Sequence, residues 1–265
     1  LFDIKSSQEV TSDKDVIGNA DYAVEFRGVS LKYKNAGEDS LTGMDFAVKR
    51  GETVGIIGGT GSGKSSLVNM IPRFYDATAG EVLIGGRDVK SFEIPELRER
   101  IGIVPQKAVL FKGSIRDNMR WGKDDATDDE ILAAAKTAQA ADVIESKGGL
   151  DFEIEQGGKN LSGGQRQRFT IARALVRKPE ILILDDSASA LDFATDAALR
   201  RSIREMDTNP TVFIVSQRTS SIQHADKIIV LDDGKIAGIG KHDELLNNCP
   251  VYSEIYNSQF KKEAV

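Results

Sequence analysis

The sequence predicts an α/β fold with a mixed, largely parallel sheet as its core, an N-terminal antiparallel β subdomain and an inserted α-helical subdomain. Residues 23–33 and 41–48 alternate apolar and polar side chains around a glycine turn, which is typical of antiparallel strands. Residues from about 107 to 178 have a helical pattern instead. After them, apolar runs alternate with a helical segment, which indicates the βαβ units of a parallel sheet.

The composition is that of a globular protein. The chain has 265 residues, 40% of them hydrophobic, so it can bury the core of one large domain. Its formal net charge of -6 provides no diffuse basic field for a phosphate backbone, and we expect no nucleic-acid partner. Cys249 is the only cysteine, which indicates a reducing compartment such as the cytosol. All apolar runs fall far short of the roughly 20 residues that a membrane helix requires.

The first residues, 1–20, are polar and aperiodic, and we expect a linker there. The chain starts with Leu1 rather than Met and carries no signal-peptide pattern, so we expect it to be part of a longer protein. Residues 21–265 are predicted to form one domain, with its helical subdomain at about 107–178.

The first half of this domain contains a strand, a loop and a helix in succession. Residues 53–57 form a short apolar run, a glycine-rich loop follows, and residues 65–70 have a helical pattern that Pro72 ends. Thr127 opens a capping box, which predicts an alanine-rich helix from there to about residue 145.

The second half alternates helices and strands. A helix is predicted from Ser162 to Val176 and another over residues 194–206. The strands expected between and after these helices cover residues 181–184, 211–215 and 227–231.

The loop after residues 53–57 matches the phosphate-binding pattern G-x-x-x-x-G-K-[ST]. Glycines permit backbone conformations in which N–H groups point inward, and the start of the following helix adds partial positive charge, so this loop can hold phosphates. Lys64 is expected to reach the β and γ phosphates of ATP, and the Ser65 hydroxyl to ligate Mg²⁺. The nucleotide-binding residues predicted here are Gly58, Gly59, Thr60, Gly61, Ser62, Gly63, Lys64, Ser65 and Ser66.

Two adjacent carboxylates, Asp185 and Asp186, follow the apolar run ILIL. A carboxylate at the carboxyl edge of the sheet can hold Mg²⁺ through water opposite Ser65, and this is the role predicted for Asp185. The alternative role, capping the next helix, fits Asp185 poorly, because Asp186 and Ser187 are equally placed to cap.

The segment LSGGQ is the second specific motif, formed by Leu161, Ser162, Gly163, Gly164 and Gln165. A phosphate loop, LSGGQ and an apolar strand ending in Asp, in that order, resemble the nucleotide-binding domain of ATP-binding cassette (ABC) proteins. The resemblance covers about residues 22–260 and implies a P-loop NTPase (RecA-like) core.

The resemblance implies roles for residues outside the phosphate loop. Tyr33 matches the aromatic residue that stacks on adenine, although an ordinary strand aromatic is the alternative. Gln106 matches the glutamine that touches Mg²⁺ and the attacking water and hinges the helical subdomain. LSGGQ matches the signature that closes over ATP held by the opposite subunit, and Asp192 lies in a segment that resembles the loop crossing this interface. The resemblance therefore implies a dimer with two ATP molecules at its interface.

Residues 110–118 and 240–246 look most like ABC domains of the exporter type, which follow a membrane domain in the same chain. This resemblance implies two partners, a second nucleotide-binding domain and a membrane domain, and a location at the cytoplasmic face of a membrane. Two alternatives stay open: a soluble ABC ATPase that acts on nucleic acid or ribosomes, and an ATP-dependent clamp that seldom hydrolyses.

Three positions depart from the family pattern. Asp186 stands where active members have Glu, and one methylene less withdraws its oxygens by roughly 1 Å from the attacking water. Gln217 stands where the family has a His, and an amide cannot carry positive charge. Gln156 stands where exporters often have Glu that contacts the membrane domain.

His224 and His242 lie outside the family's histidine motif, so neither replaces the missing histidine. We therefore predict that this chain's own site, with Asp186, Gln217 and Gln106 as its catalytic positions, hydrolyses ATP slowly. Its signature is predicted to complete a competent site on a different partner chain in a heterodimer.

Overall fold

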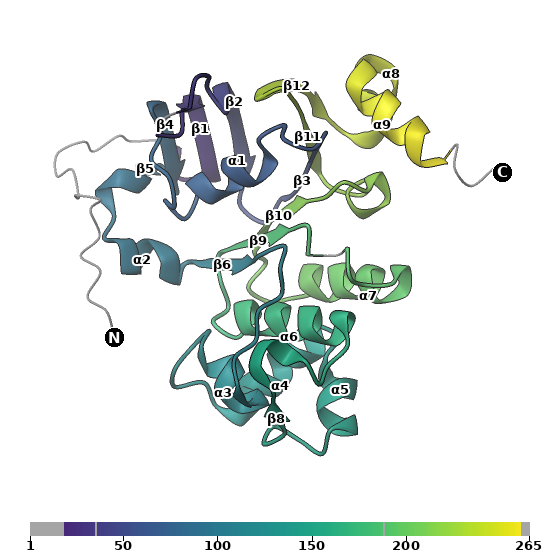
Figure 1. Ribbon diagram of the computed structural model, residues 1–265. Coiled ribbons are helices and arrows are strands. Elements are labelled where there is room, and N and C mark those ends of the chain that lie inside the picture. Colours follow the sequence, from purple (N-terminus) through teal and green to yellow (C-terminus); the bar gives the residue numbers. More distant parts are fainter. Residues whose placement is uncertain (1–18, 35, 188, 261–265) are drawn as a thin grey trace.

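The computed structural model describes residues 19–34, 36–187 and 189–260. The linker predicted at 1–20 therefore lies almost entirely outside the described residues. Within them, the elements form an antiparallel sheet, a central six-stranded sheet and a helical part at the opposite end of the molecule (Figure 1).

The N-terminal sheet confirms the two predicted antiparallel strands and contains two more, one of six residues and one of two. Its order is β2-β1-β4-β5. Phe26 and Phe46 face each other in the β1–β2 register, and their stacked rings are 4.6 Å apart. Its strands are β1 (Tyr22–Leu31), β2 (Leu41–Lys49), β4 (Ala79–Ile84) and β5 (Arg87–Asp88).

The central sheet has the order β12-β11-β3-β10-β9-β6, in which all neighbours are parallel except the β11–β12 hairpin. The predicted parallel sheet is thus confirmed, and β12 makes it mixed. Its strands are β3 (Thr53–Gly58), β6 (Ile101–Val104), β9 (Ile181–Asp185), β10 (Thr211–Val215), β11 (Lys227–Asp232) and β12 (Lys235–Gly240).

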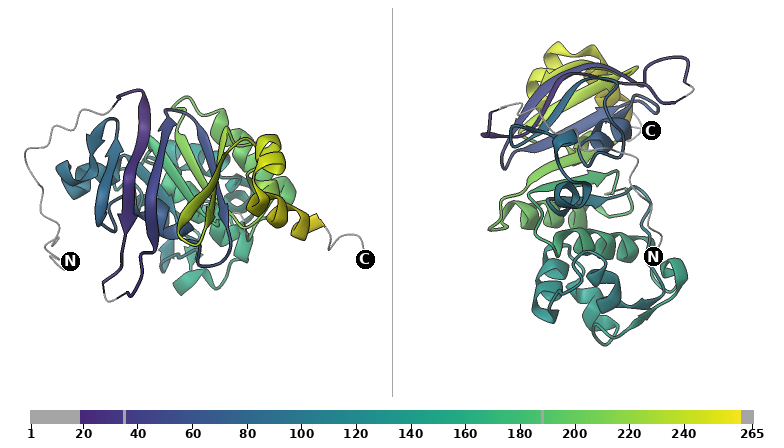
Figure 2. Two further views of the ribbon diagram at one scale, coloured as in Figure 1. Left: turned by 90° about the horizontal axis from the view of Figure 1, so that it is seen from above. Right: turned by 90° about the vertical axis from the view of Figure 1, so that its left-hand side faces the viewer.

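Both faces of this sheet are buried, which explains why its strands read as continuous apolar runs. In β9, Ile181 and Ile183 pack toward the antiparallel sheet, whereas Leu182 and Leu184 pack toward the helices of the other face. Two core clusters therefore lie on opposite sides of the central sheet. The right-hand view of Figure 2 shows the antiparallel sheet on one side of this layer and the helical part on the other.

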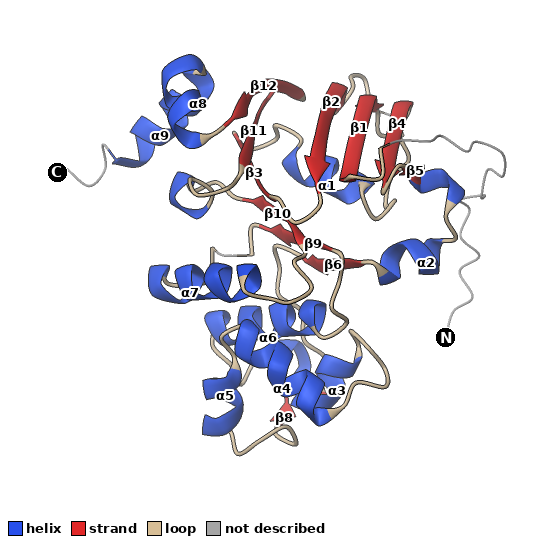
Figure 3. Ribbon diagram, turned by 180° about the vertical axis from the view of Figure 1, so that it is seen from behind, coloured by secondary structure: helices blue, strands red, loops and turns tan. Residues whose placement is uncertain are grey.

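The helical subdomain lies below the central sheet, and Figure 3 shows its helices gathered there. It contains α3 (Ile115–Arg120), α4 (Asp128–Thr137), α5 (Ala141–Ser146) and α6 (Gly163–Leu175), with a two-stranded sheet of β7 (Gly113–Ser114) and β8 (Glu153–Ile154). The helix predicted from Ser162 to Val176 is confirmed as α6, since these two residues are its N-cap and C-cap.

The single helix predicted over residues 127–145 was wrong, because the structure divides it into α4 and α5. Gln139 lies between them with a φ of 58°, a left-handed conformation that a helix cannot continue through. Its side-chain amide donates to the Ser202 hydroxyl at 2.9 Å, so a tertiary contact stabilises this break.

The remaining helices flank the two sheets, and they are α1 (Lys64–Met70), α2 (Ile94–Glu99), α7 (Phe193–Arg204), α8 (His242–Asn248) and α9 (Pro250–Phe260). Cys249 joins α8 to α9 and is 4% exposed, with its sulfur against Gly238 of β12. Of the helices in the described part of the chain, none is long and apolar enough to span a membrane.

Candidate functional site

The predicted phosphate loop connects β3 to α1 at the carboxyl edge of the central sheet (Figure 1). Gly63 is the N-cap of α1 and has a φ of 95°, so the loop turns into the helix through a conformation that favours glycine. The first N–H groups of α1 have no acceptor within the helix, which leaves them free to bind an anion.

Close packing explains the glycine at the start of this loop. A Cβ on Gly58 would lie 2.2 Å from the Leu231 carbonyl oxygen and 2.5 Å from the Ser62 hydroxyl. In contrast, a Cβ on Gly59 or Gly61 would meet nothing within 4 Å. The base of the loop is therefore packed against the protein, and its rim is open toward a ligand.

Lys64 lies inside the loop. Its Nζ donates to the carbonyl oxygens of Gly58 and Gly59 at 2.9 and 2.7 Å. Burial lowers the pKa of Lys64, and the nearby carboxylates of Asp186 and Asp185 oppose this shift. The ammonium group therefore lies within the loop, next to the position predicted for the phosphates of a nucleotide.

Ser65 and Asp185 meet across the edge of the sheet. The Ser65 hydroxyl donates to the Asp185 carboxylate at 3.2 Å, although 120 residues separate them in the sequence. Burial raises the pKa of Asp185, while the hydrogen bond from Ser65 and the charge of Lys64 lower it. A hydroxyl and a carboxylate are the hard oxygen ligands that Mg²⁺ prefers, so these residues fit the predicted metal.

Among the described residues, no three His, Cys, Asp or Glu side chains cluster as a metal site. Mg²⁺ commonly takes only one or two protein carboxylates and completes its shell with water and substrate phosphates. The pair of Ser65 and Asp185 is thus the kind of donor set that Mg²⁺ accepts from a protein, whereas the Gln106 amide donates to Asp186 instead.

Asp186 has a φ of 47°, in the left-handed region that Asp and Asn tolerate better than most residues. Its carboxylate accepts a hydrogen bond from the Gln106 amide at 3.2 Å. Sequence reasoning placed both residues near the same water but did not predict this direct contact.

Gln217 follows β10, so it lies at the same edge of the sheet as the phosphate loop and Asp185. Its side chain is exposed. Its main-chain carbonyl accepts a hydrogen bond from Gln259 of α9 at 2.7 Å. The loop that carries Gln217 is therefore tied to the C-terminal helix.

Tyr33 lies beside the phosphate loop, where its hydroxyl pairs with that of Ser66 at 2.8 Å. Both residues line a pocket of about 460 Å³ that also reaches Gly61, Gly63, Lys64 and Ser65. The sequence analysis missed its other lining residues, which are Glu38, Asp39, Ser40, Asp233 and Gly234. The Asp-Gly pair of the β11–β12 hairpin was the signal that could have revealed two of them.

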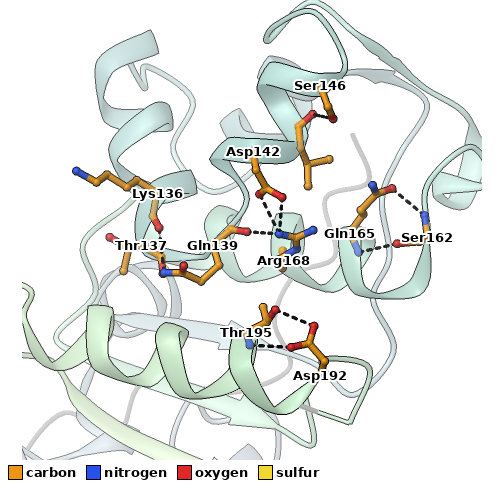
Figure 4. Close-up of polar contacts among 11 residues, drawn as sticks. Lys136, Thr137, Gln139, Asp142, Ser146, Ser162, Gln165, Arg168, Asp192 and Thr195 are labelled. Carbon is orange, nitrogen blue, oxygen red and sulfur yellow. Dashed lines mark hydrogen bonds and ion pairs between the residues drawn. The ribbon is translucent and has the colours of Figure 1, made fainter.

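The signature begins α6, on the helical subdomain, and Figure 4 shows its first turn. Ser162 and Gln165 form a capping box: the Gln165 N–H donates to the Ser162 hydroxyl at 3.2 Å, and the Ser162 N–H donates to Gln165 Oε1 at 3.0 Å. One turn later, Arg168 binds Asp142 and the Gln139 carbonyl oxygen. These contacts fix the start of α6 against the turn between α4 and α5.

Asp192 is the N-cap of α7, and both its oxygens accept hydrogen bonds from Thr195 (Figure 4). These bonds lower the pKa of Asp192. A Cβ on Gly164 would lie 3.3 Å from the Ala190 carbonyl oxygen, so the signature adjoins the segment that leads to Asp192.

The structure therefore divides the predicted site residues into two groups. The phosphate loop, Tyr33, Asp185, Asp186, Gln106 and Gln217 lie along one edge of the central sheet. Leu161 to Gln165 and Asp192 form a second group, and none of them lines the pocket beside the phosphate loop within the described parts of the chain. Gln156, in a short 3-10 turn before the signature, is exposed.

Comparisons with known proteins agree with this geometry. Residues 41–189 match the protein family described as "ABC transporter". The chain is 44% identical over 241 residues to "Uncharacterized ABC transporter ATP-binding protein YfiB" of Bacillus subtilis, which covers 91% of this chain and 42% of that protein. It is 38% identical over 259 residues to "ATP-dependent lipid A-core flippase" of Methylobacillus flagellatus, covering 97% of this chain and 44% of that one.

A solved structure is similar as well: "Structure of a bacterial Atm1-family ABC exporter with ATP bound" has a TM-score of 0.84 and 38% sequence identity. The match covers 91% of this chain and 42% of that one. The chain thus spans less than half the length of the relatives it matches.

Proposed function

The chain belongs to the ABC transporter family, and from this premise we propose that it is the ATP-binding domain of a membrane exporter. In this proposal the domain lies at the cytoplasmic face of the membrane and binds Mg-ATP between itself and a second nucleotide-binding domain. Hydrolysis there drives transport by a membrane domain. The main support is the phosphate loop, whose Ser65 meets Asp185, while the described residues of the signature do not line the pocket beside that loop.

ATP binding would use contacts that the loop already presents. The N–H groups of the loop and of the first turn of α1 would hold the phosphates, and Lys64 would exchange the carbonyls of Gly58 and Gly59 for phosphate oxygens. Tyr33 would stack on the adenine. Mg²⁺, held by Ser65 and Asp185, supplies positive charge that offsets the charge of the phosphates.

Slow hydrolysis at this chain's own site is a part of the proposal. A general base has to reach the proton it abstracts, and the short Asp186 side chain is engaged by the Gln106 amide. Gln217 can donate a hydrogen bond to a phosphate but cannot add positive charge to the transition state. Both groups that would act on the reacting water and the γ-phosphate are therefore weakened.

The intact signature gives this chain a second task. Ser162 and the amides that begin α6 would form an anion site on the surface of the helical subdomain, outside the pocket beside the chain's own phosphate loop. We propose that this surface closes over ATP bound by a different partner chain, whose site performs most of the hydrolysis. This arrangement explains why the binding motifs are complete although two catalytic positions are altered.

ATP affinity provides the first test. Lys64→Ala is expected to weaken ATP binding about tenfold because it removes charge-assisted hydrogen bonds to the phosphates. Tyr33→Ala is expected to weaken it about threefold through the loss of stacking. Isothermal titration calorimetry of the chain with Mg-ATP measures both effects. Unchanged affinity in both variants would show that the nucleotide binds elsewhere.

A groove between the two parts of the domain is the surface we assign to the membrane domain. It encloses about 280 Å³ between the edge strand β6 and the helices α3 and α6. Trp121, 65% exposed, lies at its rim and stacks on Phe111 with ring centroids 4.7 Å apart. Exposed aromatic side chains beside a groove lined by both apolar side chains and arginines are typical of protein interfaces. The matched relatives are more than twice as long, which leaves room for such a membrane domain.

Trp121→Ala tests this assignment in the full-length transporter. We expect about a tenfold loss of transport, because Trp121 is largely exposed and truncating an aromatic anchor residue of an interface commonly costs that much. ATP affinity of the isolated domain is expected to stay unchanged, since Trp121 does not line the nucleotide pocket. Leu132→Ala is the control, because Leu132 is also exposed (42%) but lies outside the groove. Equal transport in both variants would place the membrane domain on another surface.

A further inference from the structure

Gln259, near the end of α9, binds the loop that carries Gln217 through both ends of its side-chain amide. Its Oε1 accepts from the Thr219 N–H at 2.9 Å and from the Thr219 hydroxyl at 3.0 Å. Its Nε2 donates to the Gln217 carbonyl oxygen at 2.7 Å. These partners fix the orientation of the amide, because only its nitrogen can donate to a carbonyl and only its oxygen can accept from an N–H.

The helix that carries Gln259 is firmly anchored. Tyr252 is fully buried, and its hydroxyl pairs with Nδ1 of His242 at 2.8 Å. Val251 and Ile255 pack against the core cluster beneath the central sheet. The first half of α9 is thus held against the core, and Gln259 extends from it one turn after Ile255.

The loop between β10 and residue 219 has other hydrogen bonds, but none of those in the described part of the chain reaches the Gln217 carbonyl oxygen or the Thr219 N–H. The Ser216 N–H donates to the Ile56 carbonyl oxygen, and the Ser221 N–H donates to the Arg218 carbonyl oxygen. The Arg218 N–H donates to the Ser216 hydroxyl at 2.9 Å, and an Arg218 guanidinium nitrogen lies 3.4 Å from the Ser189 carbonyl oxygen. Thr219 is fully buried, so its N–H would be left unsatisfied without Gln259. The amide of Gln259 therefore supplies the bonds on both sides of Arg218.

We propose that Gln259 is a positioning residue: it fixes the backbone from Gln217 to Thr219 and thereby the direction in which side chain 217 reaches the γ-phosphate. The inference rests on the proposed function, which assigns residue 217 to the γ-phosphate. It gives the C-terminal helix a role in the ATP site although no atom of Gln259 contacts the nucleotide pocket. Misplacement of an aligned group by about 1 Å is enough to change a rate substantially.

The contact itself is tested without nucleotide. Gln259→Met keeps the length of the side chain and removes its hydrogen bonds, so the Thr219 amide is expected to exchange its hydrogen at least about tenfold faster. Asn257→Met is the matched control, because Asn257 lies on the exposed side of the same helix. Hydrogen exchange of the Thr219 amide, measured by NMR on the whole chain, shows whether Gln259 protects it. Equal Thr219 rates in wild type and Gln259→Met would overturn the inference.

The effect of the Gln259 contact on ATP hydrolysis is tested in a forced homodimer of a chain that carries Asp186→Glu and Gln217→His. These two substitutions restore the residues that the family has at the catalytic positions. There, Gln259→Met is expected to lower kcat about tenfold and to leave the KM for ATP unchanged. Gln259→Glu keeps the acceptor for Thr219 but faces the carbonyl of residue 217 with a carboxylate. It should therefore retain slow Thr219 exchange and still lower kcat.

The possible outcomes separate the inference from the function on which it rests. Faster Thr219 exchange with an unchanged kcat would mean that the contact only stabilises the fold, and the positioning role would be wrong. If the repaired chain is no faster than wild type, the explanation of the weak site fails instead. In that case the Thr219 exchange rates still test whether α9 holds the loop. Fast exchange of the Thr219 amide hydrogen in the wild-type chain would overturn that claim.

Discussion

Ser162→Ala in the full-length transporter is expected to lower steady-state ATP hydrolysis about a hundredfold, whereas Asp186→Asn is expected to lower it less than about twofold. In the proposed heterodimer, Ser162 would act on ATP bound by the partner chain, where most of the turnover would occur. The Asp186 carboxylate is engaged by the Gln106 amide, and its short side chain is proposed to stop short of the attacking water, so its loss is expected to change little. In a homodimer each chain supplies both halves of identical sites, and this order would reverse or vanish.

A control variant distinguishes the loss of the signature's contact with ATP from the loss of helix stability. Ser162 also caps α6, and removing an N-cap costs about 1 kcal/mol of stability by itself. Thr127→Ala removes an equivalent capping box from α4 in the same subdomain, away from the signature. The measurement is the steady-state ATPase activity of the reconstituted pair carrying each substitution separately, with trapped nucleotide assigned to each chain. Thr127→Ala is expected to lower this activity far less than Ser162→Ala. If Asp186→Asn abolishes turnover as completely as Ser162→Ala, Asp186 is a working catalytic acid and the proposed asymmetry is wrong.

Asp186→Glu combined with Gln217→His is expected to raise turnover in a forced homodimer by at least about tenfold. The longer carboxylate extends toward the water by one methylene, and the imidazole can add positive charge near the γ-phosphate. Neither residue lines the pocket that holds the rest of the nucleotide, so ATP affinity should remain the same. Single-turnover kinetics together with equilibrium ATP binding measure the two quantities separately.

The control for this gain makes the same two chemical changes elsewhere. Asp207→Glu with Gln223→His alters side chains that do not adjoin the phosphate loop. The left-handed φ of Asp186 suits Asp better than Glu, so the melting temperature of each variant has to accompany its rate. A folded, ATP-binding double variant that turns over no faster than the control would contradict the idea that these two residues limit hydrolysis.

The core of the fold could be predicted from the sequence because it is encoded locally. The continuous apolar runs of β3, β9, β10 and β11 report burial on both faces, and the strand, glycine loop and helix around Lys64 have a specific spacing. The ladder neighbours of these strands then bring Asp185 to Ser65. That part of the candidate site follows from topology alone.

The rest depends on contacts between distant residues. No glycine or proline marks the helix break at Gln139 in the sequence. The side-chain amide of Gln139 is held by Ser202, 63 residues away. The contact of Gln106 with Asp186 spans 80 residues, and that of Gln259 with Thr219 spans 40. Such long-range polar contacts have no periodic pattern in the sequence, so only the folded structure reveals them.

Cys249 can report on local opening of the C-terminal segment. It is the only thiol of the chain, it is buried against β12, and α9 begins at the next residue. A thiol reagent reacts only when that packing opens, so the labelling rate measures the local opening equilibrium of the segment that carries Gln259. Because these 265 residues contain no second cysteine that would compete for the label, the anchorage of α9 can be followed in this chain without substitution, with and without nucleotide.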